Sequence, residues 1–133
     1  MQIGLEYTAI LNVEQQHLAV NVGSGDLEVL ATPAMIALME NASMMAVKDA
    51  LEEGQTTVGG YISSSHLKPT SLEATIKATA KLVAVEGRKL TFKITAEDDG
   101  GTIGEGNIYV LWLMLESSCQ SCKDESIVHL LGK

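Results

Sequence analysis

Apolar and polar side chains alternate along residues 72–84 and again along residues 90–96 of the chain. In the first stretch the apolar positions are Leu72, Ala74, Ile76, Ala78, Ala80, Leu82 and Ala84. Because successive side chains of a strand point to opposite faces, a period of two predicts strands with one buried and one solvent-facing side. Glu86-Gly87-Arg88 between the two stretches is typical of a tight turn. The two stretches are therefore predicted to form an antiparallel hairpin.

Three further segments are predicted to be strands. Residues 98–101, Asp-Asp-Gly-Gly, are typical of a second turn, and residues 102–115 are predicted to form a long strand after it. Residues 5–13 are predicted to form the first strand and residues 56–67 an edge strand or a short strand. Together these segments predict an antiparallel sheet, of which one face must be covered.

The segment from Thr32 to about Leu51 is predicted to be a helix that is buried on most of its sides. Thr32 is a favourable N-cap residue, and Pro33 suits the first helical position. Between Ala34 and Val47 nearly every side chain is small or apolar, and Glu40 carries the only charge. Such a helix needs cover on most sides. We therefore expect the sheet to wrap around it in a single α+β domain.

The composition excludes two classes of partner. The net charge of −8 argues against nucleic acid, because phosphate binding needs a basic face, and the aromatic content of 4% leaves little for base stacking. The longest apolar stretch, residues 31–47, is interrupted by Glu40 and is too short to cross a membrane. The N-terminus does not resemble a signal peptide, so we expect a cytoplasmic protein. Because 46% of the residues are apolar, we also expect a subunit interface.

Thr32, Glu40 and His66 are the residues best suited to carry chemistry. Glu40 is either a buried general base or a carboxylate on a narrow solvent stripe or subunit interface, and we expect it to be largely buried. Thr32 is either an N-cap alone or a hydroxyl beside free helix amides that face a carbonyl oxygen. His66 is either the polar end of a strand or a base. Together the three have the parts of a nucleophile–base–orienter relay.

Four short stretches of the chain share the pattern of a known family. They are Leu30-Ala31-Thr32-Pro33-Ala34-Met35-Ile36-Ala37-Leu38-Met39-Glu40-Asn41-Ala42, Val58-Gly59-Gly60, Ser65-His66-Leu67 and Ile103-Gly104-Glu105-Gly106. In the order and spacing of these residues, the chain resembles the hot-dog-fold thioesterases, specifically the group like fluoroacetyl-CoA thioesterase, over about residues 5–106. The resemblance implies an antiparallel sheet wrapped around one long central helix. It ends after Gly106, where relatives usually continue with a histidine and an arginine.

The resemblance implies an enzyme, an acyl-CoA thioesterase acting on a small acyl-CoA. The implied catalytic residues are Thr32, Glu40 and His66, and the candidate substrate-binding residues are Gly59, Gly60 and Lys68. Coenzyme A is then part of the substrate, and neither a cofactor nor a metal is implied. A hydratase or dehydratase of the same fold and a non-catalytic binder of acyl-CoA or another small ligand are the alternatives. The identity of the acyl group stays open, as does the choice between an acyl-threonine and direct attack by water.

The hot-dog domain is expected to comprise residues 1–116, and residues 117–133 a divergent C-terminal tail. Cys119 and Cys122 in this tail have the spacing of a redox or zinc pair. A structural zinc needs four ligands, and only His129 is nearby. A redox pair normally opens a helix within a βαβ unit, which this chain lacks. We therefore interpret the two cysteines as an incidental pair.

Thr32 and Glu40 are predicted to meet in a site built from two chains. The two residues are eight positions apart on one helix, which separates their backbones by ~12 Å along the helix axis. Within one chain only His66 could bridge them. A homodimer, or a higher homo-oligomer, with composite sites is the simpler arrangement.

Several basic residues share the polar face of the predicted hairpin. Lys77, Lys81, Lys89 and Lys93 all occupy odd positions along its two strands. We expect some of these lysines, or Lys68 and Arg88, to contact the phosphates of coenzyme A. The alternative is that they are ordinary surface lysines that only increase solubility.

Overall fold

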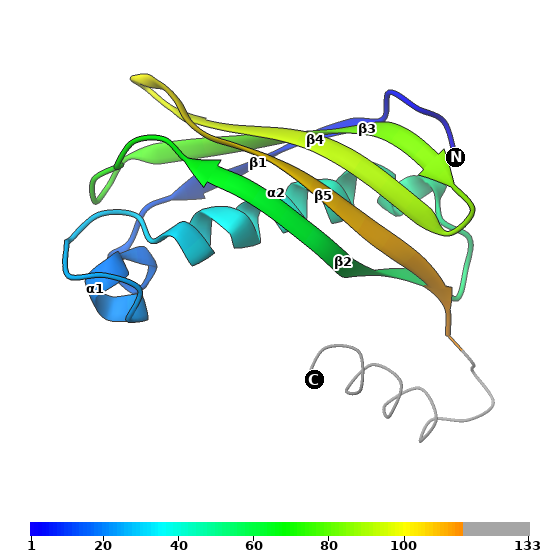
Figure 1. Cartoon of the computed structure of the whole chain (residues 1–133), viewed down its shortest axis with the longest axis horizontal. Coiled ribbons are helices and arrows are strands. Elements are labelled where there is room, and N and C mark those ends of the chain that lie inside the picture. The colour runs from blue at the N-terminus through cyan, green and yellow to red at the C-terminus, as the bar shows by residue number, and fades with distance from the viewer. Residues whose placement is uncertain (116–133) are drawn as a thin grey trace.

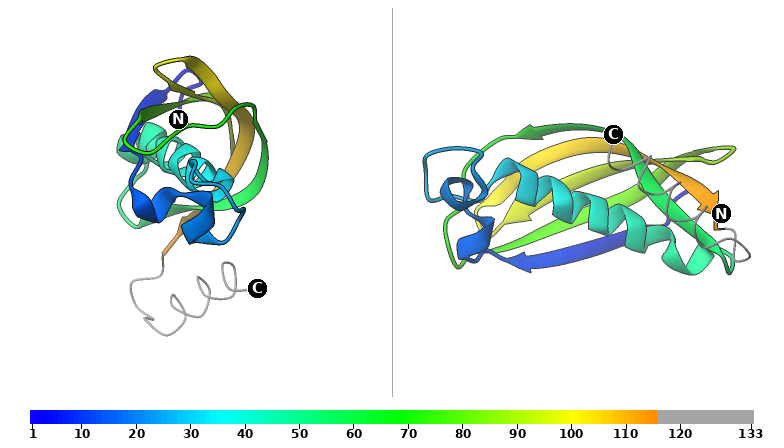
Figure 2. Two further views of the ribbon diagram at one scale, coloured as in Figure 1. Left: turned by 90° about the vertical axis from the view of Figure 1, so that its left-hand side faces the viewer. Right: turned by 90° about the horizontal axis from the view of Figure 1, so that it is seen from below.

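The structure is a computed structural model that describes residues 1–115, in which five strands form one antiparallel sheet around a long helix. The strands are β1 (Glu6–Asn12), β2 (Gln55–His66), β3 (Thr75–Glu86), β4 (Lys89–Asp98) and β5 (Gly101–Met114). The helices are α1 (Ala19–Val22) and α2 (Thr32–Val47), with short 3-10 turns η1 (Gln15–His17) and η2 (Lys48–Ala50). The sheet has the order β1-β3-β4-β5-β2 and curls around α2 (Figure 1, Figure 2). The predicted α+β architecture is confirmed.

The β3–β4 hairpin has the predicted register and the predicted faces. Ala80 lies opposite Ile94, and Leu82 lies opposite Phe92. All four of these side chains are buried in the hydrophobic core that the sheet forms with α2. The lysines of the odd positions lie on the other, outer face of the sheet, as expected from a period of two.

Strand β2 begins and ends within one residue of the predicted bounds and is an edge strand of the sheet, as predicted. It pairs with β5 from Gln55 to His66, and a bulge between Gly59 and Tyr61 interrupts the register. At the bulge, the backbone of Gly60 lies against the ring of Tyr109. A side chain at position 60 would collide with this ring. Tyr109 also stacks on Tyr61, with the ring centroids 5.6 Å apart. Because β2 is the last strand of the sheet, its second edge has no partner strand within residues 1–115.

Helix α2 begins at Thr32, so the prediction that Thr32 is the N-cap is wrong. Ala31 is the N-cap, with extended backbone angles (φ −71°, ψ 141°), and no side chain caps the helix. Pro33 follows in the first turn, where its missing N–H costs nothing. The α-helix ends at Val47, and η2 continues the chain for one turn to Ala50, close to the predicted end.

One side of α2 is not covered by the sheet, although its sequence predicts cover on most sides. The buried positions of the helix face β1, β3 and β4; they are Met35, Leu38, Met39, Ala42, Ser43 and Val47. On the side next to β2, Ala37, Asn41 and Met44 are exposed. We call these three residues the open stripe. The stripe is apolar except for Asn41, so it is a surface that a second chain can cover.

The segment between β1 and α2 contains structure that its sequence does not predict. η1, α1 and the loop of residues 23–30 pack over the N-terminal end of α2 (Figure 1). The amides of Ala19 and Val20 donate to the carbonyl oxygens of Val29 (2.7 Å) and Leu27 (3.1 Å), which ties the loop back onto α1. This segment forms one wall of the site described below.

No helix within residues 1–115 has the length and apolar character needed to cross a membrane. The predicted domain boundary after residue 116, the tail of residues 117–133 and its Cys119 and Cys122 lie outside the described residues.

Candidate active site

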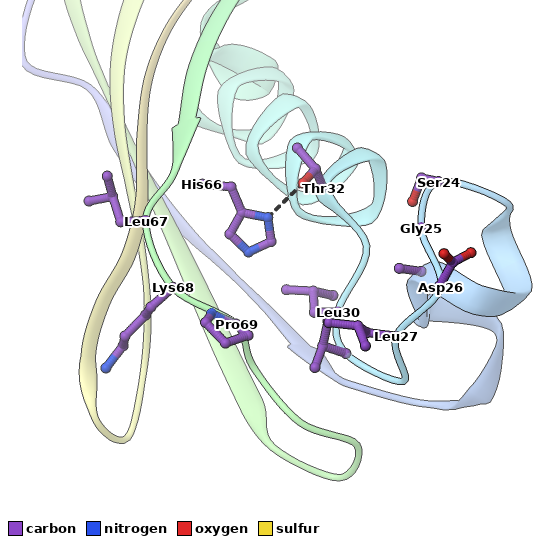
Figure 3. Close-up of a pocket in the computed structure, with 12 residues that line it drawn as sticks. Ser24, Gly25, Asp26, Leu27, Leu30, Thr32, His66, Leu67, Lys68 and Pro69 are labelled. Atoms are coloured by element: carbon purple, nitrogen blue, oxygen red, sulfur yellow. Dashed lines mark hydrogen bonds between the residues drawn. The ribbon is translucent and has the colours of Figure 1, made fainter.

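Thr32 and His66 are in direct contact, although they lie 34 positions apart in the sequence. Thr32 is the first residue of α2, and His66 is the last residue of β2. The Thr32 hydroxyl and the Nδ1 atom of His66 form a hydrogen bond of 2.7 Å (Figure 3). When the neutral ring carries its proton on Nε2, the hydroxyl is the donor and Nδ1 the acceptor. This is the arrangement in which an imidazole can take a proton from a hydroxyl.

The Thr32–His66 pair lies at a hollow of about 380 Å³. One wall comes from Ala19 of α1 and from the loop of residues 23–30 that carries Asp26 and Leu27, and the other comes from residues 66–69 (Figure 3). The amides of Leu67 and Lys68 both donate to the carbonyl oxygen of Ile103, which fixes the chain immediately after His66. The hollow is of the size that small ligands occupy.

Burial keeps the ring of His66 neutral. Its Nε2 atom is shielded from solvent and has no hydrogen-bond partner within residues 1–115. Desolvation lowers the pKa of His66 below the usual value for histidine, because burial disfavours the charged imidazolium. At neutral pH the ring is therefore in the form that accepts a proton.

The lowered pKa of His66 predicts the pH dependence of any reaction that uses it as a base. Activity falls as the pH drops through the pKa of His66, so we expect the acid limb of kcat/KM to have its midpoint below ~6.5. Rates measured between pH 4.5 and 8 check this, with His66→Gln as the variant that should lack the limb. A midpoint at or above the usual histidine value would contradict a base desolvated by the fold.

Among the described residues, the start of α2 has one backbone amide without a hydrogen-bond partner, fewer than a helix N-terminus usually has. Pro33 has no N–H, and the amides of Ala34 and Met35 both donate to the carbonyl oxygen of Ala31, at 3.0 and 3.1 Å. The Thr32 amide remains, beside the Thr32 hydroxyl. It is a free donor adjacent to the Thr32–His66 pair, of the kind that can stabilise an oxyanion.

Glu40 lies outside the Thr32–His66 hollow, on the same helix. It is only half-buried, so the expectation that it is largely buried is wrong for the single chain. The reason is that Glu40 borders the open stripe, which the sheet does not cover. Glu40 and Gly59 together line two smaller hollows of about 300 and 260 Å³ between α2 and β2. Within one chain, the structure thus brings together two of the three predicted catalytic residues and not the third.

Gly59 leaves room for the Glu40 carboxylate. A Cβ atom at position 59 would lie 2.9 Å from Oε2 of Glu40. We therefore expect Gly59→Ala to displace the carboxylate and to lower kcat on the order of tenfold to a hundredfold, the usual result of moving a reacting group by about 1 Å. Steady-state kinetics measure the loss.

The Gly59→Ala prediction has a control in a double-mutant cycle. In a Glu40→Gln background, Gly59→Ala should cost little more, because the group that it displaces has already lost its charge. Equal losses in both backgrounds would show that the substitution acts through β2 and not through Glu40.

Gly60 and Lys68, the other candidate substrate-binding residues, are placed differently from Gly59. Gly60 borders the hollow of about 300 Å³ at Glu40, and its outer side is covered by the ring of Tyr109. Lys68 borders the Thr32–His66 hollow, but its ammonium group points away from Thr32 and His66 (Figure 3). The ammonium donates to the carbonyl oxygen of Gly100 at 2.8 Å and forms an ion pair with Asp98 at 3.7 Å.

The loop wall of the hollow is the part of the site that sequence reasoning missed. Asp26, Leu27 and Leu30 line the hollow, yet their stretch has no periodicity or motif that predicts a pocket. Within residues 1–115, no group of three or more His, Cys, Asp or Glu side chains is arranged to hold a metal ion.

Comparisons with known proteins agree on one group of enzymes. A family model described as fluoroacetyl-CoA-specific thioesterase matches residues 13–110. The chain is similar to the fluoroacetyl-CoA thioesterase of Streptantibioticus cattleyicolor, with 39% identity over 79 residues. That alignment covers 59% of this chain and 57% of the relative, so the chain matches little more than half of the relative's length.

Solved structures extend the similarity to nearly the whole chain. A phenylalanine-to-alanine mutant of the fluoroacetyl-CoA-specific thioesterase FlK, in complex with fluoroacetate and CoA, superimposes with a TM-score of 0.82 and 30% identity, covering 90% of this chain and 100% of that one. A hot-dog-like protein from Thermanaerovibrio acidaminovorans has a TM-score of 0.82 and 18% identity, covering 100% of this chain and 95% of that one. The hot-dog fold expected from the sequence is thereby confirmed.

Proposed function

This chain belongs to the fluoroacetyl-CoA-specific thioesterase family, and we propose that it hydrolyses the thioester bond of a small acyl-CoA. The observation that carries the proposal is the 2.7 Å hydrogen bond between the Thr32 hydroxyl and Nδ1 of His66, two residues that line the same hollow. The relatives' names and the FlK complex with fluoroacetate and CoA support an acyl-CoA as the substrate. A hollow of about 380 Å³ has room for a small acyl group.

In the proposed reaction, neutral His66 acts as the general base. It takes a proton from the nucleophile, which is either the Thr32 hydroxyl or a water molecule in its place. The nucleophile attacks the thioester carbonyl carbon, and the Thr32 amide donates to the oxyanion that forms. When the carbon–sulfur bond breaks, the imidazolium returns its proton to the leaving thiolate. In the water route the products are a carboxylic acid and free coenzyme A. In the Thr32 route the first products are an acyl-threonine and coenzyme A, and a water molecule that gives its proton to His66 then attacks the ester carbonyl, which releases the acid and returns the proton to the Thr32 oxygen. An acyl-threonine trapped for mass spectrometry would identify the Thr32 route.

We further propose that the active form is a homodimer in which Glu40 reaches the Thr32–His66 pair of the partner subunit. Three features support this. The spacing of Thr32 and Glu40 along one helix is ~12 Å, which a glutamate side chain does not bridge. The open stripe on α2 is largely apolar, and the twelve-residue strand β2 next to it has one edge without a partner strand in the part of the chain that the structure describes. Free strand edges and uncovered apolar stripes are the surfaces that symmetric dimers bury.

Within this dimer Glu40 would orient the base or the attacking water. It lies beside Gly59, whose missing side chain leaves space for the Glu40 carboxylate. A carboxylate that meets His66 would hold the ring in the tautomer that accepts the Thr32 proton. Nε2 of His66 has no hydrogen-bond partner within residues 1–115, but the chain shields it from solvent, so a carboxylate of the partner subunit reaches it only if the side chains around the ring shift.

The proposed contacts of coenzyme A involve basic side chains near the hollow. Lys68 borders it, and its ion pair with Asp98 is partly exposed, so a phosphate can replace the carboxylate at little cost. The lysines on the outer face of the sheet are the other candidates. Coenzyme A enters as part of the substrate; no bound cofactor or metal is proposed, and a cytoplasmic location stays a prediction.

A thiol-release assay tests the proposal. The purified protein is incubated with short, medium and aryl acyl-CoAs, and free coenzyme A is measured with a thiol reagent. We expect release with at least one short-chain substrate. Hydration of an enoyl-CoA without thiol release would instead show a hydratase of the same fold. Tight acyl-CoA binding without either reaction would show a non-catalytic binder.

A further inference from the structure

The loop that faces the Thr32–His66 pair is held in place by backbone hydrogen bonds. The amides of Gly23 and Ser24 donate to the carbonyl oxygen of Ala19, at 2.9 and 3.1 Å, and the carbonyl oxygen of Leu27 accepts from Val20 at 3.1 Å. Asp26 lies between these anchored positions. Its place at the wall of the hollow therefore follows from the local fold, and Figure 3 shows it on the opposite side of the hollow from His66.

Asp26 carries the one uncompensated charge among the described residues that line this hollow. The lining contains two side chains that are charged at neutral pH, Asp26 and Lys68, and a histidine that burial keeps neutral. The charge of Lys68 is offset by Asp98, and its ammonium group points away from the reacting pair. Asp26 forms no ion pair within residues 1–115. Glu28, in the same loop, adds a second negative charge nearby, and residues 18–31 contain no lysine or arginine.

From this arrangement we infer that Asp26 selects the charge of the acyl group. The site accepts small acyl groups that are neutral or positively charged and disfavours those that end in a carboxylate. The inference rests on the proposed function, because it takes the Thr32–His66 hollow as the acyl site. The remaining wall, with Leu27, Leu30 and Ala19, provides apolar surface for a short aliphatic chain.

The expected size of the effect is modest because Asp26 is exposed to solvent. Two unit charges across a hollow of this size interact through a mixture of water and protein, which corresponds to roughly a threefold to tenfold change in kcat/KM for each charged substrate. The effect should shrink as salt is added, since exposed charges are screened within ~10 Å at 0.1 M salt.

Three acyl-CoAs of matched length test the inference. Butyryl-CoA is neutral, β-alanyl-CoA replaces its terminal methyl group by an ammonium group, and malonyl-CoA ends in a carboxylate. We compare each charged substrate with butyryl-CoA by the ratio of their kcat/KM values. For the wild type, we expect this ratio to be above one for β-alanyl-CoA and below one for malonyl-CoA. Asp26→Asn should bring both ratios toward one. Asp49→Asn removes the same charge at the far end of α2, and it should leave both ratios and the activity unchanged.

The outcomes separate this inference from the proposed function. Ratios that do not change in Asp26→Asn, or that change equally in Asp49→Asn, would overturn the role of Asp26 while thioester hydrolysis stands. If the wild type releases no thiol from any substrate, the proposed function fails, and dissociation constants for the same three acyl-CoAs then test the charge preference directly. Absence of binding, or binding without a charge preference that depends on Asp26, would overturn the inference too.

Discussion

Replacing Thr32 by alanine is expected to lower kcat/KM for the preferred acyl-CoA by two to four orders of magnitude, the range that a group acting with a general base typically contributes. The variant loses the hydroxyl that contacts His66 at 2.7 Å, and with it either the nucleophile or the group that positions the attacking water. Thr32 is exposed and its side chain does not cap α2, so folding should be little affected. Thiol release and a thermal unfolding curve, measured on the same preparation, check both statements.

Two matched substitutions show whether the hydroxyl of Thr32 is responsible. Thr32→Ser keeps the hydroxyl, removes only a methyl group and should retain most of the activity. Thr8→Ala removes a hydroxyl of the same kind from the outer face of the sheet, where it bonds Thr79 at 2.8 Å, and should have no effect on turnover. A Thr32→Ala enzyme within threefold of wild type would exclude a direct role for this hydroxyl.

The fold was largely predictable because its strongest signals are local. The alternation along residues 72–96 places the buried residues of β3 and β4 on one face, as the structure shows for Ala80, Leu82 and Phe92. The bounds of strand β2 were predicted to within one residue, although Gly59-Gly60 and Ser63-Ser64-Ser65 have low strand propensity. Its pairing with β5 joins residues about fifty positions apart, and no local pattern contains that contact.

The site was less predictable, because the contact between Thr32 and His66 is made by the fold. The order and spacing of these residues suggested a family, and that resemblance, not periodicity, linked them. Thr32 was expected to cap the helix, whereas Ala31 takes the N-cap position and the hydroxyl is free to bond His66. Glu40 was expected to be buried because its neighbours in the sequence are apolar. In the single chain some of those apolar residues form the open stripe, and Glu40 lies beside them.

Mixing two inactive variants, Thr32→Ala and Glu40→Gln, is expected to restore activity if the proposed composite site is correct. The two proteins are unfolded, combined in equal amounts and refolded together. In each mixed dimer, one site then contains both substitutions and the other contains neither. About half of the dimers are mixed and half of their sites are intact, so roughly a quarter of the wild-type activity should return. Thiol release, with mixed dimers verified by distinct affinity tags, measures the recovery.

The structure also provides the matched mixture that must fail. Thr32 and His66 contact each other within one chain, so a mixture of Thr32→Ala with His66→Gln leaves one defect in every site and should stay inactive. Recovery in this second mixture would mean that His66 acts across the interface, against the 2.7 Å contact within the chain. If neither mixture recovers although mixed dimers are present, Glu40 acts within its own chain. Because Thr32 and Glu40 are ~12 Å apart along α2, a substrate or a chain of water molecules would then have to extend from the Thr32–His66 hollow to Glu40.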